Sequence, residues 1–199
     1  MAGTSHGIHI RRGKSADLDA LWDLESRVFA TDRMSRRSLR RLLASPSAAA
    51  VVARSDGAIA GVAVLLFRTN SRIARLYSLA VAPKHTGRGI ASALLAAAEK
   101  TARSRKCQWL RLEVHEKNHG AIQVYRKAGY NEFGRHHHYY QDRGDALKFE
   151  KRLTRLSRSA MLVRDSLNPD GQSGILYDVA SCRSGRSTKA TNAWKGARS

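Results

Sequence analysis

Acidic residues are scarce in this chain of 199 residues: 16 Asp and Glu stand against 36 Lys and Arg, which gives a formal charge of +20. This surplus does not specify a fold, but it favours anionic partners such as nucleic acid, ribosomes or anionic cofactors. It also argues against strongly cationic substrates. Cysteine is scarce too, and Cys107 and Cys182 lack the spacing of a metal site. A disulfide framework is therefore not expected, and the low cysteine content is consistent with a protein of the reducing cytosol.

Long apolar runs are also missing, and no secretory leader is expected. The longest nearly uncharged apolar run covers residues 57–67, whereas a membrane span needs about 20 apolar residues. The first residues lack a basic segment followed by an apolar one. We therefore expect a cytoplasmic protein with no membrane association. Hydrophobic residues make up 42% of the chain and charged residues 26%, a composition typical of globular domains.

Alternating strand and helix patterns over residues 1–153 predict one mixed α/β domain, in which helices cover a single sheet. Strands are expected at residues 9–12, 48–54, 58–68, 73–81, 109–115, 130–141 and 145–153. Helices are expected from a cap at Ser15, over 35–44 and 90–105, and from Asn118 to a stop at Gly129. Residues 154–199 form a basic, Ser- and Gly-rich tail that we expect to be flexible, with one helix at 155–167 as a further option.

The most informative segment is a glycine-containing turn between a predicted strand and a predicted helix, Thr86-Gly87-Arg88-Gly89-Ile90-Ala91-Ser92. Glycine lets the backbone approach a ligand closely. The unpaired N–H groups of the first helical turn, together with the helix dipole, form an anion site suited to a pyrophosphate. The segment is neither a complete dinucleotide fingerprint nor a Walker loop. An ordinary strand–helix turn with two glycines has the same pattern.

At this turn the chain resembles the GNAT superfamily of acyl-CoA-dependent N-acetyltransferases, whose pyrophosphate turn follows the pattern Gln/Arg-x-x-Gly-x-Gly/Ala. Gly89 and Ala91 match that pattern, and Thr86 departs from it at the first position. Further matches at residues 79–83, 112–114 and 118–130 have spacings similar to the RimI-like branch, which acetylates protein N-termini, notably on ribosomal proteins. The resemblance covers residues 8–153. It implies the GNAT fold: a mixed, mostly antiparallel sheet, splayed between its fourth and fifth strands and flanked by helices.

The resemblance also implies a co-substrate and the residues that bind it. Acetyl-CoA would be the acyl donor, with direct attack by an amine in a ternary complex and without a metal. Its pyrophosphate would lie on the glycine turn, and its pantetheine arm would pair with the backbone of a splayed strand. The binding residues would be Gly87, Arg88, Gly89, Ile90, Ala91 and Ser92 of the turn, Leu79, Ala80 and Val81 of the strand, and Asn118.

Two residues are candidates for proton transfer. Glu113 lies in a strand between Leu112 and Val114, so it faces away from them and is the candidate base. An exposed strand carboxylate is the plainer interpretation, and Glu116 is a nearby alternative. Tyr125 is the candidate acid for the leaving thiolate, and a core aromatic side chain is the alternative. Asn118 is expected to cap the helix of Tyr125 in either case.

The run His136-His137-His138 does not predict a metal site, because alternate side chains of a strand point to opposite faces. The segment from His138 through Tyr139 and Tyr140 resembles an Asn-Tyr-Tyr segment that lines the acceptor slot of RimI-like enzymes. Two surface tyrosines are the alternative. The acceptor would be a protein N-terminal amine or a small amine.

A cluster of arginines and the net charge leave a rival function open. Arg36, Arg37, Arg40 and Arg41 form a basic stripe on a predicted helix. Such a stripe is usually a solvated face, although it would also suit an acidic substrate or ribosomal RNA. The rival functions are a non-catalytic module that binds nucleic acid or ribosomes, and an acyl-CoA-binding regulator.

Overall fold

The computed structural model describes residues 7–29, 33–140 and 142–153 of the chain. The predicted tail, with its optional helix at 155–167, lies outside them. The strands are β1 (His9–Arg12), β2 (Ala48–Ser55), β3 (Ala58–Phe67), β4 (Ile73–Val81), β5 (Trp109–His115), β6 (Asn131–His136) and β7 (Ala146–Arg152). The helices are α1 (Leu18–Val28), α2 (Arg36–Ala44), α3 (Ile90–Ser104) and α4 (His119–Lys127), with short 3₁₀ turns η1 (Ser15–Asp17) and η2 (Pro83–His85).

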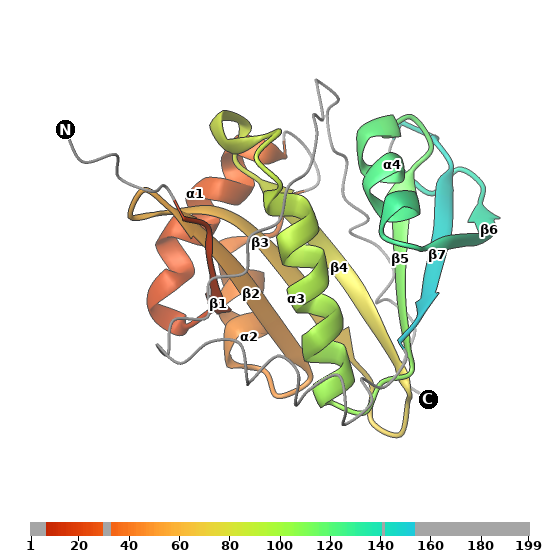
Figure 1. The fold of residues 1–199 in the computed structure, drawn as a ribbon, viewed down its shortest axis with the longest axis horizontal. Coiled ribbons are helices and arrows are strands. Elements are labelled where there is room, and N and C mark those ends of the chain that lie inside the picture. Colours follow the sequence, from red (N-terminus) through yellow and green to blue (C-terminus); the bar gives the residue numbers. More distant parts are fainter. Residues whose placement is uncertain (1–6, 30–32, 141, 154–199) are drawn as a thin grey trace, which may run out of the picture.

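The strands form one sheet in the order β1-β2-β3-β4-β5-β7-β6 (Figure 1). Neighbouring strands are antiparallel except for β4 and β5, which are parallel. The turn between β2 and β3 contains Asp56 and Gly57, both with positive φ, as expected for a tight hairpin. The mixed, mostly antiparallel sheet predicted from the sequence is confirmed.

The parallel pair β4/β5 opens into a fork. The two strands are in register from Ile73 and Trp109 to Leu76 and Leu112, and their pairing ends there. Each continues beyond that point with its other neighbour, β4 with β3 as far as Val81 and β5 with β7 as far as His115. The predicted splay is thus present, and beyond this point no strand in the described part of the chain pairs with the facing backbone edges of β4 and β5.

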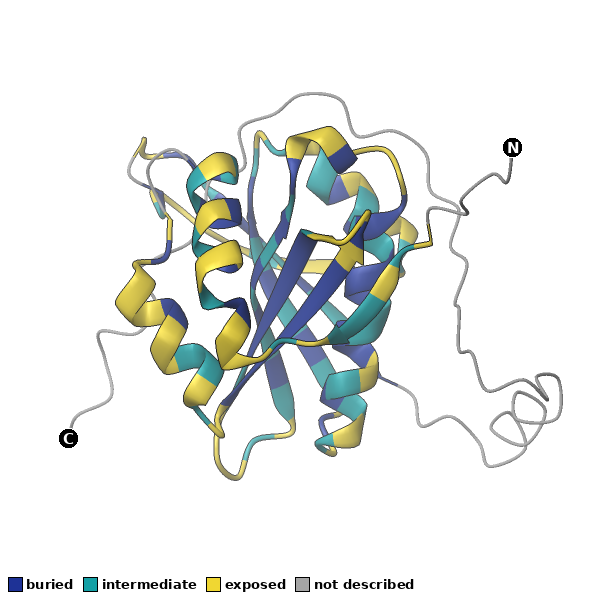
Figure 2. Cartoon of the chain, turned by 90° about the vertical axis from the view of Figure 1, so that its left-hand side faces the viewer, coloured by how far each residue is buried: buried dark blue, intermediate teal, exposed yellow. Residues whose placement is uncertain are grey.

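Helices cover both faces of the sheet. In Figure 2 each helix turns buried residues inward and exposed residues outward. Side chains of α3 and α4 pack in one core with alternate residues of the strands, among them Leu110, Leu112 and Val114. Side chains of α1 and α2 form a second core with other strand residues, such as Val52 and Val62. None of the helices in the described ranges is long and apolar enough to cross a membrane.

One extra residue interrupts β4 opposite β3. Leu76 pairs with Leu65 and Ser78 pairs with Val64, so Tyr77 forms a β-bulge. Leu76 lies in the core beneath α3. After the bulge, the Ser78 hydroxyl faces α1 and donates to Glu25 Oε1 at 3.5 Å. The bulge therefore changes which residues of β4 face each side of the sheet.

Two details of the predicted elements are wrong. Ser15 does not cap the first helix: it lies in η1, and the carboxylate of Asp17 instead accepts from Lys14 N at 2.7 Å and Arg11 Nη1 at 2.8 Å. The strand predicted at 130–141 is shorter, because β6 ends at His136. The chain then turns, and the Asp145 carboxylate accepts from the backbone N–H of His138 at 3.1 Å.

Candidate active site

The predicted glycine turn connects β4 to α3 in the expected conformation. Gly87 and Gly89 both have φ of +78°, a region that favours glycine. The hydroxyl of Thr86 donates to Pro83 O at 2.8 Å, so it stabilises the turn itself. Gly89 is the N-cap and offers no side chain, and the first helical bond runs from Ala93 N to Gly89 O. The N–H groups of residues 90–92 therefore lie before the first hydrogen bond of the helix, and they can bind an anion.

Arg88 is held at the mouth of this turn by two partners. Its Nη1 lies 3.0 Å from His85 Nδ1 and 3.5 Å from Asp56 Oδ2. An arginine can only donate, so His85 accepts through Nδ1. Burial lowers the pKa of His85, and the nearby charges of Arg88 and Lys84 lower it further. A neutral His85 thus positions a guanidinium that is still 38% exposed beside the anion site.

The β4 residues expected to bind a cofactor lie beyond the point where β4 and β5 separate. Ala80 is buried, whereas Leu79 and Val81 are partly exposed. Because β5 has diverged, no strand of the described residues pairs with the β5-facing backbone of residues 79–81, and an extended ligand chain could pair there. The fork therefore offers a strand-like binding edge directly before the glycine turn.

Asn118 and Tyr125 lie on α4, on the opposite arm of the fork. Asn118 Oδ1 accepts from Ala121 N at 3.1 Å, which confirms its predicted capping role. Tyr125 is 7% exposed and packs in the core, its ring centroid 5.9 Å from Tyr130 and 6.3 Å from Phe149. Burial raises the pKa of Tyr125, so its hydroxyl stays protonated. The side chain is both a core aromatic group and a potential proton donor.

Glu113 faces away from the α3 core, as its alternation with Leu112 and Val114 predicts. Its side chain is only 13% exposed, which makes a plain surface carboxylate the wrong interpretation. Glu113 Oε2 forms an ion pair with Arg75 Nη2 at 2.8 Å. The same Nη2 donates to the hydroxyl of Tyr139 at 3.3 Å. Side chains from β4, β5 and the loop after β6 therefore meet at the base of the fork.

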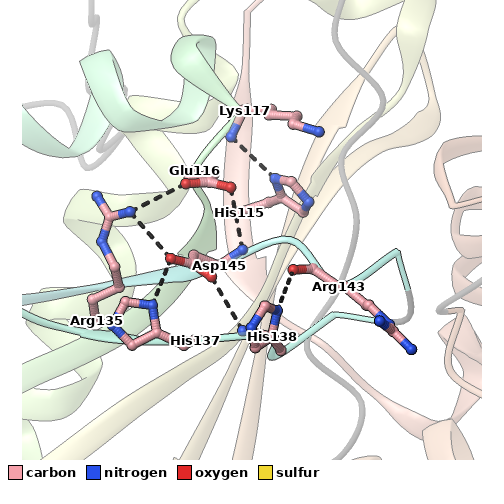
Figure 3. Close-up of polar contacts among 8 residues, drawn as sticks. All are labelled: His115, Glu116, Lys117, Arg135, His137, His138, Arg143 and Asp145. Carbon is pink, nitrogen blue, oxygen red and sulfur yellow. Dashed lines mark hydrogen bonds and ion pairs between the residues drawn. The ribbon is translucent and has the colours of Figure 1, made fainter.

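A polar network holds the loop between β6 and β7 against the sheet (Figure 3). Asp145 accepts from Arg135 at 3.2 Å and contacts His137 Nδ1 at 2.9 Å. Glu116 accepts from Arg135 at 3.2 Å and from Asp145 N at 3.4 Å. Glu116, the alternative base, is therefore engaged in the loop network.

His115 anchors the same loop from the end of β5. Its Nδ1 accepts from Lys117 N at 3.0 Å, and its Nε2 lies 3.1 Å from Asp142 Oδ2. The His115 ring packs 4.6 Å from the ring of Tyr140. Tyr140 is buried and Tyr139 is partly buried, so the alternative of two surface tyrosines is wrong.

The three consecutive histidines are used separately. His136 stacks on Tyr139 with ring centroids 5.5 Å apart, and His137 contacts Asp145. The ring of His138 contacts Arg143 O at 3.2 Å. Among the described residues, no group of three or more His, Cys, Asp and Glu side chains could hold a metal ion.

The sequence analysis did not identify Arg75 or His115 as parts of the site. Arg75 does have a signal in the sequence, because it is the one charged residue in the otherwise uncharged strand Ile73–Val81. Its partners come from β5 and from a loop more than sixty residues away. Only the folded arrangement shows that contact.

The site has a turn with helix-terminal amides that could bind an anion and a forked strand edge on one side, and the half-buried carboxylate of Glu113 on the other. The sequence matches the profile of the Acetyltransferase (GNAT) family over residues 17–130. The chain belongs to this family. It is an acyl-CoA-dependent N-acyltransferase with the GNAT fold.

Relatives and solved structures share this fold over most of their length. The N-alpha-acetyltransferase RimI of Mycobacterium tuberculosis is 33% identical over 132 residues, which cover 65% of this chain and 82% of that protein. The ribosomal-protein-S18-alanine N-acetyltransferase from Escherichia coli, known from a crystal structure, is 25% identical in sequence and matches with a TM-score of 0.68. The match covers 75% of this chain and 96% of that chain. A ribosomal-protein-alanine N-acetyltransferase from Brucella melitensis is 26% identical with a TM-score of 0.65, over 73% and 99% of the two chains.

Proposed function

We propose that this enzyme transfers the acetyl group of acetyl-CoA to the amino group at the N-terminus of a protein. The observation that carries the proposal is the fork between β4 and β5, which separates an anion-binding helix terminus from the half-buried carboxylate of Glu113. A ligand chain in the fork would have its pyrophosphate on the turn and its thioester near that carboxylate. The names of the relatives, which describe N-terminal acetylation, support the same acceptor.

The glycine turn and β4 bind the donor in this proposal. The backbone amides around Gly87 and Gly89 hold the pyrophosphate, and Arg88 adds a positive charge beside it. The backbone of Leu79 and Val81 pairs with the pantetheine amides. The N–H of Val81 also polarises the thioester carbonyl, where negative charge develops as the amine attacks.

Glu113 and Tyr125 move the protons. Glu113 accepts a proton from the attacking amine, directly or through one water molecule, while the new C–N bond forms. The C–S bond then breaks, and the hydroxyl of Tyr125 protonates or hydrogen-bonds the departing sulfur. Tyr125 suits this role because burial raises its pKa and keeps the phenol protonated. No covalent acyl-enzyme is required.

An N-terminal amine suits this site better than a lysine side chain. Its pKa is about 8, against about 10.4 for lysine, so a single carboxylate is a sufficient base. Tyr139 and Tyr140 lie in the loop that reaches the base of the fork, where they would flank the acceptor peptide. A small amine would need none of these loop contacts, so acceptor length separates the two substrate classes.

The test is thiol release from acetyl-CoA with matched peptides. One peptide carries a free N-terminal alanine and no lysine, and its control has a blocked N-terminus and one lysine. We expect turnover with the first and little with the second, and mass spectrometry should place one acetyl group on the N-terminal nitrogen. Turnover only with lysine or small polyamines would contradict the acceptor. Salt-sensitive RNA binding by a protein that releases no CoA would favour the non-catalytic rival.

A further inference from the structure

We propose that Arg75 is a positioning residue for the acceptor, which sets the arrangement of Glu113 and Tyr139 as one unit. This inference rests on the proposed function, because it assigns Glu113 to the base of that reaction. The relevant feature is a single guanidinium nitrogen, Nη2, that contacts both groups: Glu113 Oε2 at 2.8 Å and the Tyr139 hydroxyl at 3.3 Å.

The place of Arg75 in the fork explains why it can act in this way. Arg75 is in register with Arg111, one residue before the last pair of the parallel ladder. Its backbone therefore belongs to the fixed part of the fork. Glu113 lies on β5 just after the strands separate, and Tyr139 lies on the loop after β6. The Arg75 side chain thus ties two diverging segments to the rigid part of the sheet.

The burial of the Arg75–Glu113 ion pair strengthens its effect on the position of Glu113. The side chains of Arg75 and Glu113 are 28% and 13% exposed, so the pair is largely shielded from water. A planar guanidinium also fixes the direction of the carboxylate more narrowly than a flexible ammonium group does. The Nε of Arg75 is buried and has no hydrogen-bond partner among the described residues. Among the described residues, the polar contacts of the Arg75 guanidinium are those of Nη2 with Glu113 and Tyr139.

The Tyr139 hydroxyl is oriented by the same contact. Its oxygen accepts from Arg75, which turns the O–H proton away from the guanidinium and leaves it to donate elsewhere. Through these two contacts, Arg75 orients an acceptor group, the Glu113 carboxylate, and a donor group, the Tyr139 hydroxyl, toward the same space. An attacking amine that carries a peptide needs both: an acceptor for its proton and a donor for its first carbonyl oxygen.

A second ion pair on the same sheet provides a matched control. Arg111 and Glu150, on β5 and β7, also form a contact of 2.8 Å. Arg111 lies two residues before Glu113 and therefore on the same face of β5. It is 40% exposed and contacts neither Glu113 nor Tyr139 in the contacts described for this part of the chain. Arg111→Met therefore removes an arginine–glutamate pair, together with the contact of Arg111 over the Phe133 ring at 4.8 Å, without touching Glu113 or Tyr139.

The experiment compares Arg75→Met, Arg75→Lys and Arg111→Met with the alanine peptide as acceptor. For Arg75→Met we expect kcat/KM for the peptide to fall about tenfold to a hundredfold, the effect of a misplaced reacting group. The KM for acetyl-CoA should stay within about twofold, because the glycine turn is untouched. Arg75→Lys should recover part of the loss. Arg111→Met should match the wild type.

A second measurement does not depend on turnover. In protein labelled with ¹³C at the tyrosine ζ carbon, the Tyr139 signal is identified by its loss in Tyr139→Phe. We expect it to shift in Arg75→Met and to stay in place in Arg111→Met. If Arg75→Met does not fold, Tyr139→Phe and Arg75→Lys carry the kinetic test, and both should lower kcat/KM for the peptide.

The outcomes separate this inference from the function on which it rests. A wild-type protein that acetylates no N-terminal amine overturns the proposed function. An active wild type with unchanged kcat/KM in Arg75→Met, or with equal losses in Arg75→Met and Arg111→Met, overturns only the role of Arg75. A loss confined to the KM for acetyl-CoA also overturns it, because the contact would then serve the donor.

Discussion

The two sides of the fork present different kinds of chemical group, backbone amides on one side and side chains on the other. The side next to α3 is made of backbone: two glycines with positive φ and the unpaired amides of a helix terminus. The side next to the β6–β7 loop is made of side chains, with Glu113, Arg75 and Tyr139 joined through one nitrogen atom. A backbone site tolerates many side-chain changes but not a change of backbone conformation. A side-chain site is lost when a single functional group is removed.

The largest expected effect breaks the backbone side. Gly87 has φ of +78°, and a Cβ added there meets no protein atom within 4 Å. We expect Gly87→Glu to fold but to weaken acetyl-CoA binding by at least about a hundredfold, because a carboxylate would occupy the phosphate position and repel it. Calorimetric titration with CoA measures this loss.

Gly129→Glu is the control for that substitution. Gly129 has nearly the same φ, +82°, and lies at the end of α4. It should show a similar loss of thermal stability without a loss of CoA affinity. Unchanged affinity in a folded Gly87→Glu protein would mean that the turn does not hold the phosphates.

A smaller effect tests the chemistry between the two sides. Tyr125→Phe keeps the buried ring and removes the hydroxyl that would protonate the sulfur. General acid catalysis contributes about 10²- to 10⁴-fold, so kcat should fall at least about tenfold even if water partly substitutes. Binding of CoA should change little, because the loss is felt in the transition state.

Tyr130→Phe is matched to this change, because Tyr130 is also buried and its ring lies 5.9 Å from that of Tyr125. It should leave kcat near the wild-type value. If Tyr125→Phe also turns over at the wild-type rate when chemistry is rate-limiting, Tyr125 is only a packing residue and another group serves the thiolate.

His85, which contacts Arg88 of the glycine turn, should make the stability of the fold depend on pH. Burial lowers the pKa of His85, so the unfolded chain takes up a proton at a higher pH than the folded chain does. The free energy of unfolding should therefore decrease as the pH falls below about 6.5. Above that pH, His85 should make no contribution to the pH dependence of stability. His85→Gln keeps an acceptor for Arg88 and should reduce the drop in melting temperature between pH 7.5 and 5.5 by up to about 3 °C. The exposed His9, changed to Gln, is the control, and an equal change in both variants would contradict the assignment.

The smallest effect should come from the tail. We propose that residues 1–153 are a complete catalytic domain, because the site residues all precede residue 154 and Leu153 is still held in the core. A protein that ends at Leu153 should melt within about 2 °C of the full chain and keep its kcat. Loss of cooperative melting after truncation would show that residues beyond 153 belong to the core.

The backbone side was far more predictable from the sequence than the side-chain side. The glycines, the helix start at Ile90 and the bounds of β4 and β5 follow from local propensities and from a period of two, which need no tertiary information. The direction of Glu113 follows from the same period. The contact of Arg75 with Tyr139 does not, because it depends on how a distant loop returns to the sheet. The expected cap at Ser15 failed because Ser15 lies inside the 3₁₀ turn η1, where the Asp17 carboxylate accepts from Lys14 N and from Arg11 of the preceding strand.

The bulge at Tyr77 has a consequence for how this strand can change in length. In a regular strand, Arg75 and Ser78 would point to opposite faces, since they are three residues apart. Because of the extra residue, both side chains lie on the face of the sheet that α1 covers, while Leu76, Leu79 and Val81 lie on the other face. The count of residues between Arg75 and Val81 therefore matters more than most of their identities. Deletion of one residue there would turn either the arginine or the serine away from its partners, so this stretch should accept substitutions much more readily than insertions or deletions.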